Sequence, residues 1–174
     1  ELAAEGLVAL LNKKIDYSNP NVPCGVIAAL GLIGKNVKLE SGDDLLTHLA
    51  KGLADGQLFG RDIKNEDQIR AFCGYAITKI GDPKALPDVL AILKSRSAGR
   101  VIKRSAAIAA GVLGAKADAE MKKEAVKILR SFVSKKAKDP SGENFGIIAL
   151  SQIASRKALE TLLEIADSGK YGQR

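Results

Sequence analysis

The sequence is poor in the residue types from which active sites and metal centres are built. It contains no Trp, one His and two Cys, and aromatic residues make up only 4% of its 174 residues. It has no Cys-x-x-Cys pair and no Gly-x-x-x-x-Gly-Lys loop, so a metal centre, a disulfide framework and a phosphate loop are poorly supported. We expect Cys24 and Cys73 to be buried free thiols, because unpaired Cys is among the most buried residue types.

The only histidine, His48, is a weak candidate for a general base. Such a base needs an orienting partner and a nucleophile within reach. Asp44 lies one helical turn earlier, but the sequence places no Ser or Cys beside the two residues. We therefore expect His48 to lie on the surface or in a groove. We predict that the chain is not an enzyme and that it has no catalytic, cofactor-binding or metal-binding residues.

Long hydrophobic runs are also missing. No apolar segment approaches the roughly 20 residues of a membrane span, and the first residues lack the basic-then-apolar pattern of a signal peptide. We expect a soluble, cytoplasmic protein that does not enter a membrane. Because the chain begins at Glu1 with a segment that already looks helical, we also expect it to be a piece of a longer protein.

What the chain does have is one short helical pattern that occurs four times, in residues 26–34, 73–81, 106–114 and 146–154. Each copy holds an Ala, a small or β-hydroxy residue two positions later, then an aliphatic residue, then Gly or Ala. Four copies of one helical unit predict an all-α solenoid, which is usually a binding surface. The Ala column is Ala29, Ala76, Ala109 and Ala149, and the small-residue column is Gly31, Thr78, Gly111 and Ser151.

A second amphipathic segment follows each copy of the pattern. These segments are predicted as helices over 43–54, 82–93, 119–135 and 157–166. Asp82 and Pro83 are a typical N-cap and first-turn proline, and Ser41 with Asp44 could form a capping box. The last of these helices is expected to be amphipathic, with Leu159, Leu162, Leu163 and Ala166 as its apolar positions.

The chain is therefore predicted to form one domain, residues 1–174. Residues 2–11 look like the second helix of a preceding unit, so the prediction is a leading helix plus about four helix pairs in a right-handed α–α superhelix. The repeat steps of 47, 33 and 40 residues place the insertions in loops. The units are roughly 1–14 (partial), 22–54, 69–97, 100–136 and 143–168.

One of these units resembles a known family. The segment Ile80-Gly-Asp-Pro-Lys-Ala-Leu-Pro-Asp-Val-Leu90, preceded by Ala76, is similar to the core of a HEAT-like repeat of the phycobilisome-lyase type. The resemblance covers nearly the whole chain, although only the second repeat carries Asp-Pro after its glycine. The family includes scaffolds, lyase subunits and enzyme regulators, and distant relatives excise alkylated bases from DNA. The resemblance implies a fold, with the second helices lining a concave groove, and specifies no activity.

The positive charge of the chain is concentrated in its third repeat. Residues 94–138 hold 13 basic and three acidic side chains, a net of +10, against −2 in residues 1–93 and −1 in residues 139–174. Cations also crowd the start of the third repeat's first helix, where the helix dipole disfavours them. These features indicate an anionic ligand, although a solubilising surface is an open alternative. The candidate binding residues are Lys123, Lys127 and Arg130 on the second helix, and Arg100, Lys103 and Arg104 on the first.

Three functions follow as hypotheses. The leading one is a non-catalytic scaffold that binds an acidic segment of another protein in its groove. The second is binding of the phosphate backbone of nucleic acid, for which the sequence offers cations but few aromatic stacking residues. The third is a lyase-like or regulatory subunit of an enzyme. The loop 55–68, with Leu58, Phe59 and Ile63, is either functional or an apolar cover over the step between two units.

Overall fold

The computed structural model describes residues 2–12, 19–34, 39, 44–63, 66–134 and 140–168. Over these residues the chain forms nine α-helices, one short 3-10 helix and a two-stranded hairpin, so the prediction of an all-α fold is confirmed. The elements are α1 (Leu2–Asn12), α2 (Asn21–Ile33), α3 (Leu45–Asp55), β1 (Gln57–Leu58), β2 (Arg61–Asp62), α4 (Asp67–Ile80), η1 (Pro83–Ala85), α5 (Leu86–Lys94), α6 (Arg100–Lys116), α7 (Ala119–Ser134), α8 (Pro140–Ile153) and α9 (Arg156–Asp167).

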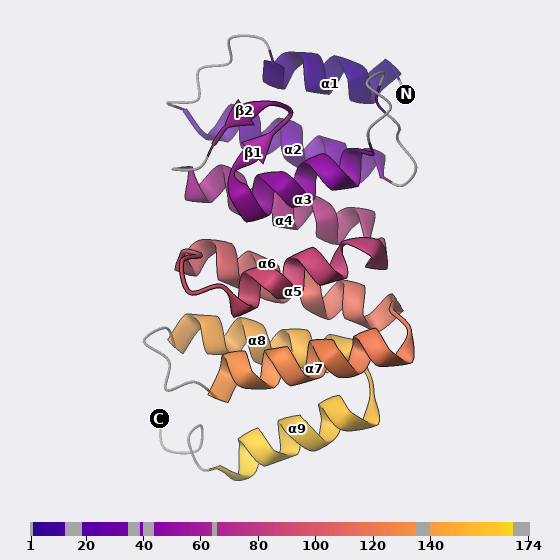
Figure 1. Ribbon diagram of the computed structural model, residues 1–174, viewed down its shortest axis with the longest axis vertical. Coiled ribbons are helices and arrows are strands. Elements are labelled where there is room, and N and C mark those ends of the chain that lie inside the picture. The colour runs from indigo at the N-terminus through magenta and orange to yellow at the C-terminus, as the bar shows by residue number, and fades with distance from the viewer. Residues whose placement is uncertain are drawn as a thin grey trace.

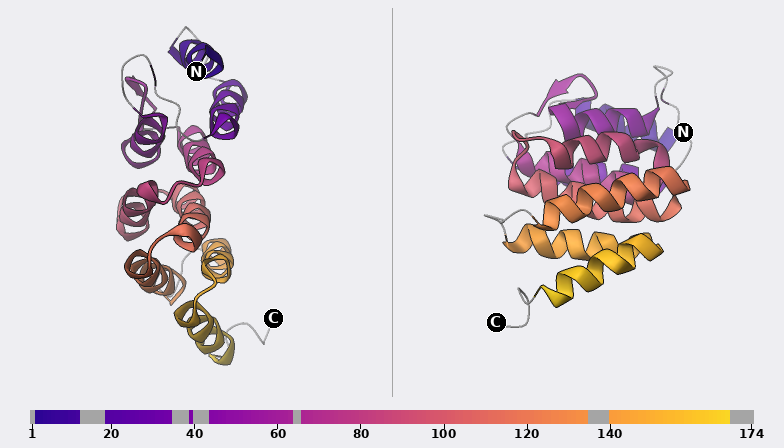
Figure 2. Two further views of the ribbon diagram at one scale, coloured as in Figure 1. Left: turned by 90° about the vertical axis from the view of Figure 1, so that its right-hand side faces the viewer. Right: turned by 60° about the horizontal axis from the view of Figure 1, so that its bottom comes forward.

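The helices stack in two layers along the long axis of the molecule (Figures 1 and 2). Helices α2, α4, α6 and α8 form the A layer, in which each contacts the next. Helices α3, α5 and α7 form the B layer, and α9 continues its series of contacts. Helix α1 lies at one end of the stack and α9 at the other.

Each B-layer helix packs mainly on the A-layer helix that follows it in the chain. Helix α3 packs on α4, α5 on α6, and α7 on α8, and α1 contacts α2 in the same order. Helix α9 has no following helix among the described residues. The repeated contact is therefore a junction between consecutive units, and each helix pair depends on the next pair to cover it.

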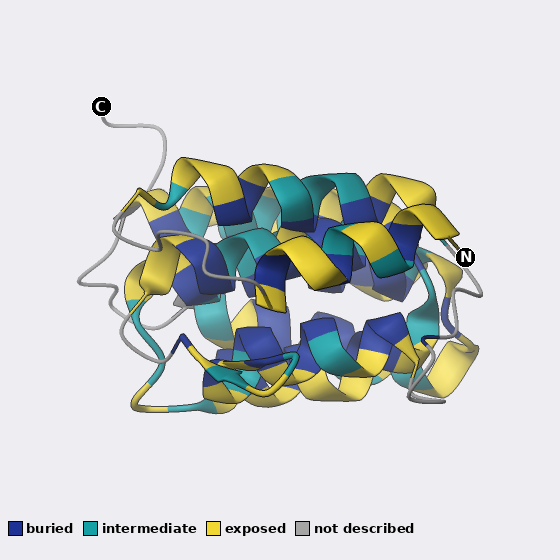
Figure 3. Ribbon diagram, turned by 90° about the horizontal axis from the view of Figure 1, so that it is seen from above, coloured by how far each residue is buried: buried dark blue, intermediate teal, exposed yellow. Residues whose placement is uncertain are grey.

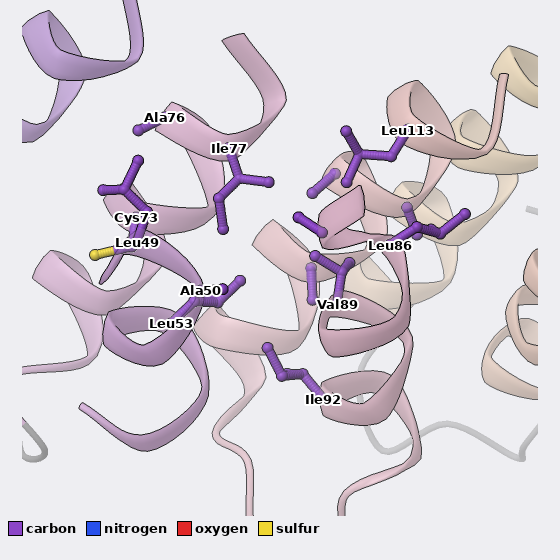
Figure 4. Close-up of a cluster of buried hydrophobic side chains, with 14 of the residues drawn as sticks. Leu49, Ala50, Leu53, Cys73, Ala76, Ile77, Leu86, Val89, Ile92 and Leu113 are labelled. Atoms are coloured by element: carbon purple, nitrogen blue, oxygen red, sulfur yellow. The ribbon is translucent and has the colours of Figure 1, made fainter. Parts of the chain in front are cut away.

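The core lies between the two layers, where the buried residues of both face one another (Figure 3). Leu49 and Leu53 of α3 meet Cys73 and Ile77 of α4 there, next to Val89 of α5 (Figure 4). All five side chains are fully buried. Burial of a leucine or isoleucine side chain contributes about 1.5–3 kcal/mol. Helices this short are not stable in isolation, so contacts of this kind between helices provide most of their stability.

The small-residue column has a direct structural cause. A Cβ atom built on Gly31 would lie 2.6 Å from Cα of Ala76, and one on Gly111 would lie 2.6 Å from Cα of Ala149. Helices α2 and α4, and likewise α6 and α8, thus approach backbone to backbone where a glycine of one unit meets the Ala of the next. Glycine is required at these crossings because any side chain would push the two helices apart.

The predicted cap of the second repeat is confirmed, and that of the first is not. Asp82 accepts a hydrogen bond from the Lys84 amide at 3.0 Å and begins η1, which leads into α5. In the first repeat, α3 begins at Leu45, and Asp44 is itself the N-cap, accepting from the Leu46 amide at 3.1 Å. The proposed capping box would have made Asp44 a first-turn residue, and its other member, Ser41, lies outside the described residues.

The apolar face predicted for the last helix is mostly exposed, and of its leucines only Leu162 packs against the core. In α9, Leu159 is 58% exposed and Leu163 is 55% exposed, whereas Ala158 and Thr161 are buried. The physical reason is the missing cover, since no further A-layer helix lies against this side of α9 in the described chain. Helix α9 instead packs through its Ala158 side onto α8 and α7.

Candidate binding surface

The candidate cations of the second helix share the outer face of α7. Asp118 precedes this helix and accepts a hydrogen bond from the Met121 amide at 2.8 Å, which fixes where α7 begins. Ala125, Val126 and Leu129 then face the core and turn the opposite side outward. Lys123, Lys127 and Arg130 all lie on that side and are exposed, as their helical spacing predicted.

Arg130, unlike the two lysines, already forms an ion pair within the described part of the chain. Its guanidinium donates to Oε2 of Glu164 on α9 at 2.7 Å, with both side chains about half exposed. Between α5 and α7, Lys94 and Glu124 form a similar pair at 3.2 Å. Exposed pairs of this kind contribute about 0–1 kcal/mol each, so they tie adjacent B-layer helices together only weakly.

Lys123 and Lys127 remain as the cations that point outward on α7. None of the described carboxylates forms an ion pair with either of them. They are one helical turn apart, which places their ammonium groups side by side on the surface. Two exposed cations at this spacing suit an anionic group that bridges them.

The candidate cations of α6 are not part of the same surface. Arg100 is exposed and Lys103 and Arg104 are half-buried at the start of this A-layer helix, whereas α7 belongs to the B layer. A carboxylate that sequence reasoning missed also lies there, because a Cβ built on Gly99, the N-cap of α6, would lie 2.5 Å from Oδ2 of Asp67. Asp67 thus provides negative charge where the dipole of α6 favours it.

His48 is half-buried, and its ring lies against that of Phe59, with centroids 4.8 Å apart and an interplanar angle of 30°. The carboxylate of Asp44, which could have oriented the imidazole, is instead used as the cap of α3. The structure thus places His48 in an aromatic contact under the β1–β2 hairpin.

The two cysteines are free and buried. Burial raises the pKa of both thiols, most strongly that of Cys73, where the nearby Cys24 adds to the effect. A thiol with a raised pKa is protonated at neutral pH and is a poor nucleophile. The described residues also contain no group of three His, Cys, Asp or Glu side chains that could hold a metal ion.

The loop 55–68 contains the β1–β2 hairpin, which covers the end of the B layer above α3 (Figure 1). Leu58 and Ile63 are buried at 1% and 2% exposure, and Phe59 is half-buried against the core. Arg61 donates to the Asn12 carbonyl at the end of α1, at 2.7 Å. Of the two predicted roles, the packing favours the apolar cover.

No family model matches the sequence, and no curated protein is significantly similar to it. Within the described ranges, every helix is too short or too polar to cross a bilayer.

Proposed function

We propose that this chain is a non-catalytic scaffold, a right-handed HEAT-like superhelix that binds an acidic segment of another protein along its B layer. The observation that carries the proposal is the pair Lys123 and Lys127, exposed on the outer face of α7 in the repeat that holds the chain's positive excess. Stacked helices form a long rigid surface, which suits an extended or helical segment of a partner.

The electrostatics support an acidic partner. A carboxylate of the partner that contacts both lysines would form two charge-assisted hydrogen bonds. Arg130 contributes less, because it already pairs with Glu164. Such a surface steers the encounter and loses affinity as salt rises, since exposed charges are screened within about 8 Å at physiological ionic strength.

A fluorescently labelled polyglutamate peptide tests the proposal by polarisation at low and high salt. We expect the Lys123→Glu/Lys127→Glu variant to bind at least about tenfold more weakly than the unmodified chain, and its binding to depend less on salt. The matched control is Lys51→Glu/Lys84→Glu, which makes the same change of net charge at two exposed positions, in α3 and in η1, outside the third repeat. Equal losses in both variants would show a non-specific charge effect and contradict the proposed surface.

Nucleic acid is the alternative partner, and a labelled DNA duplex in the same assay distinguishes it. Phosphate contacts are strongest at low salt, so binding of the duplex and not of the peptide at about 50 mM salt would favour nucleic acid. The six candidate cations lie in two layers, which argues against one continuous phosphate track. A lyase-like role would instead be indicated by a coloured adduct after incubation with bilin, which the two protonated thiols argue against.

A further inference from the structure

The outer side of the A layer carries a second pattern that runs through all four units. It consists of two positions, the one just before the Ala column and the one three residues after that column. In every copy the side chains at both positions are exposed or half-buried. We call these eight residues the A-layer strip: Ala28 and Leu32 on α2, Tyr75 and Lys79 on α4, Ile108 and Val112 on α6, and Ile148 and Gln152 on α8.

The A-layer strip is mainly apolar, unlike the charged outer face of α7. Six of its eight side chains are aliphatic or aromatic, and none is a carboxylate. Leu32 is 70% exposed, Ile148 48% and Tyr75 42%. In the left view of Figure 2 no described helix lies outside the A layer. Helices α4 and α6 have A-layer neighbours on both sides, so the exposure of the strip there does not depend on the two ends of the stack. An apolar patch that continues over several helices is typical of an interaction site.

The A layer is also basic. Its four helices hold six basic and two acidic residues, and α2 has no charged residue. Both carboxylates, Asp67 and Glu143, lie in the first turns of their helices, more than one turn before the strip. Lys79 lies within the strip, and none of the described carboxylates forms an ion pair with it. Arg104 lies one turn before the strip on α6. A partner on this strip would therefore meet apolar surface and positive charge together.

Tyr75 has a fixed orientation in the middle of the strip. Its ring lies beside that of Phe72, with centroids 6.0 Å apart, and Nζ of Lys79 lies 5.1 Å from its centroid. Both neighbours belong to α4, so the ring is held by its own helix. An aromatic side chain that is already oriented loses little entropy on binding, and tyrosine is enriched among the residues that dominate binding energy. We therefore expect Tyr75 to be the main anchor of a contact.

We propose that the A-layer strip binds an amphipathic helix of another protein, which has apolar residues at heptad spacing and acidic residues beside them. Packed helices lie about 8–10 Å apart, and seven residues of an α-helix span about 10.5 Å. A partner helix that follows the stack would thus bring one apolar side chain to each A-layer helix in turn. The two rows of the strip are four residues apart on each helix, or about 6 Å, which suits partner residues three or four positions apart. The proposal does not rest on the B-layer surface.

Charge and burial favour this partner over a second copy of the chain and over a membrane. Two copies would bring two basic A layers together, and like charges oppose such a contact. Binding to a membrane requires apolar side chains that reach the acyl chains, whereas Ala28, Ile108 and Val112 are half-buried. A helix with an apolar side and flanking carboxylates complements both the apolar rows and Lys79.

A fluorescein-labelled peptide of three heptads tests the proposal by polarisation. It has Leu at the first and fourth positions of each heptad and Glu on either side of them. The chain that carries Lys123→Glu/Lys127→Glu is used throughout, so that the B-layer surface cannot account for binding. We expect this chain to bind the peptide with a Kd in the micromolar range and to bind polyglutamate much more weakly. If the B-layer proposal fails, this result is unaffected.

Substitutions in the same chain locate the contact. Tyr75→Glu/Ile148→Glu should raise the Kd by at least about tenfold, because two charges would be buried against the apolar side of the peptide. Leu10→Glu/Leu163→Glu is the matched control, since it makes the same change at two exposed apolar positions on α1 and α9. It should leave the Kd nearly unchanged. All four side chains are exposed, so the helical circular dichroism should be retained.

Reversal of a single charge tests the acidic part of the proposal. Lys79→Glu should weaken binding of the Glu peptide by at least about threefold and strengthen binding of a peptide with Lys in place of Glu. No binding at millimolar protein, or an equal loss in the matched control, would overturn the proposal. Binding to vesicles of phosphatidylcholine and phosphatidylserine, without binding to the peptide, would assign the strip to a membrane and overturn it as well.

Discussion

The guanidinium of Arg70 donates from Nη2 to the carbonyl oxygen of Ala54 at 2.7 Å and to that of Leu53 at 3.1 Å. Arg70 lies in the first turn of α4 and is only 9% exposed, and the two carbonyls belong to the last turn of α3. A cation at the C-terminal end of a helix satisfies carbonyls that have no partner within that helix and opposes its dipole. Arg70 thus joins the two helices at the point where the chain leaves α3 for the hairpin.

Replacing Arg70 by Met should destabilise the protein. The substitution keeps much of the buried stem but removes two charge-assisted hydrogen bonds, so the free energy of unfolding should fall by about 3 kcal/mol in a urea titration. Arg61→Met is the matched control, because Arg61 also donates to a helix-terminal carbonyl, that of Asn12, but in an exposed setting. Its cost should stay below about 1 kcal/mol. Equal costs would contradict the role assigned to burial.

Gly111→Ala should destabilise the protein although alanine is the better helix former. The added Cβ would lie 2.6 Å from Cα and 2.9 Å from the carbonyl oxygen of Ala149, so α8 would have to move away from α6. Such overpacking costs about 1–3 kcal/mol, which outweighs the helix propensity of about 1 kcal/mol that alanine gains. Chemical unfolding followed by circular dichroism measures the difference.

Gly25→Ala is the control with the opposite expected sign. Gly25 lies inside α2 and is exposed, and its Cβ would meet no atom within 4 Å. The variant should gain up to about 1 kcal/mol from helix propensity alone. If Gly111→Ala were also stabilising, the backbone contact between α6 and α8 would not be the reason for glycine at that position.

The sequence predicted the parts of the fold that depend on local or repeated signals. The Ala column is fully buried at Ala76, Ala109 and Ala149, and Asp82 is the cap that its position before a proline indicated. These signals repeat or act within a few residues, so one sequence suffices to read them. The exposure of Lys123, Lys127 and Arg130 on α7 could also be predicted, because helical spacing alone places them on the side opposite the core.

Features that depend on distant parts of the chain could not be predicted. Leu159 is exposed because none of the described helices covers its side of α9, and the motif itself does not encode such a cover. The ion pair of Arg130 with Glu164 can be predicted only when the distance between α7 and α9 is known. The hairpin turn is formed by Phe59 and Gly60 at φ 48° and 80°, and a Phe in that left-handed region is not a recognised turn signal. The ring of Phe59 packs on the ring of His48, and this contact explains why a Phe stands at that position.

The β1–β2 hairpin should contribute to stability. Leu58 is 1% exposed, so Leu58→Ala should lower the free energy of unfolding by about 3 kcal/mol through lost burial and a cavity. Its neighbour Gln57 is exposed, and Gln57→Ala should change stability by less than about 0.5 kcal/mol. Thermal or urea unfolding of the two variants compares them directly. A neutral Leu58→Ala would show that the hairpin does not pack as a cover and would reopen a functional role for it.

The buried thiols should make the protein less stable at alkaline pH. In the folded state the pKa of Cys73 is raised by burial, whereas in the unfolded chain it returns to about 8.5. A group whose pKa is raised on folding stabilises the protein fully below its unfolded pKa, and this contribution is lost as the pH rises above that value. From pH 7 to pH 10, Cys73 alone should remove about 2 kcal/mol, because each unit above the unfolded pKa costs about 1.4 kcal/mol. Urea titrations of the unmodified chain and of Cys73→Ala at both pH values measure this. The variant should start lower, from lost packing, and fall less steeply, whereas parallel curves would contradict a protonated thiol in the core.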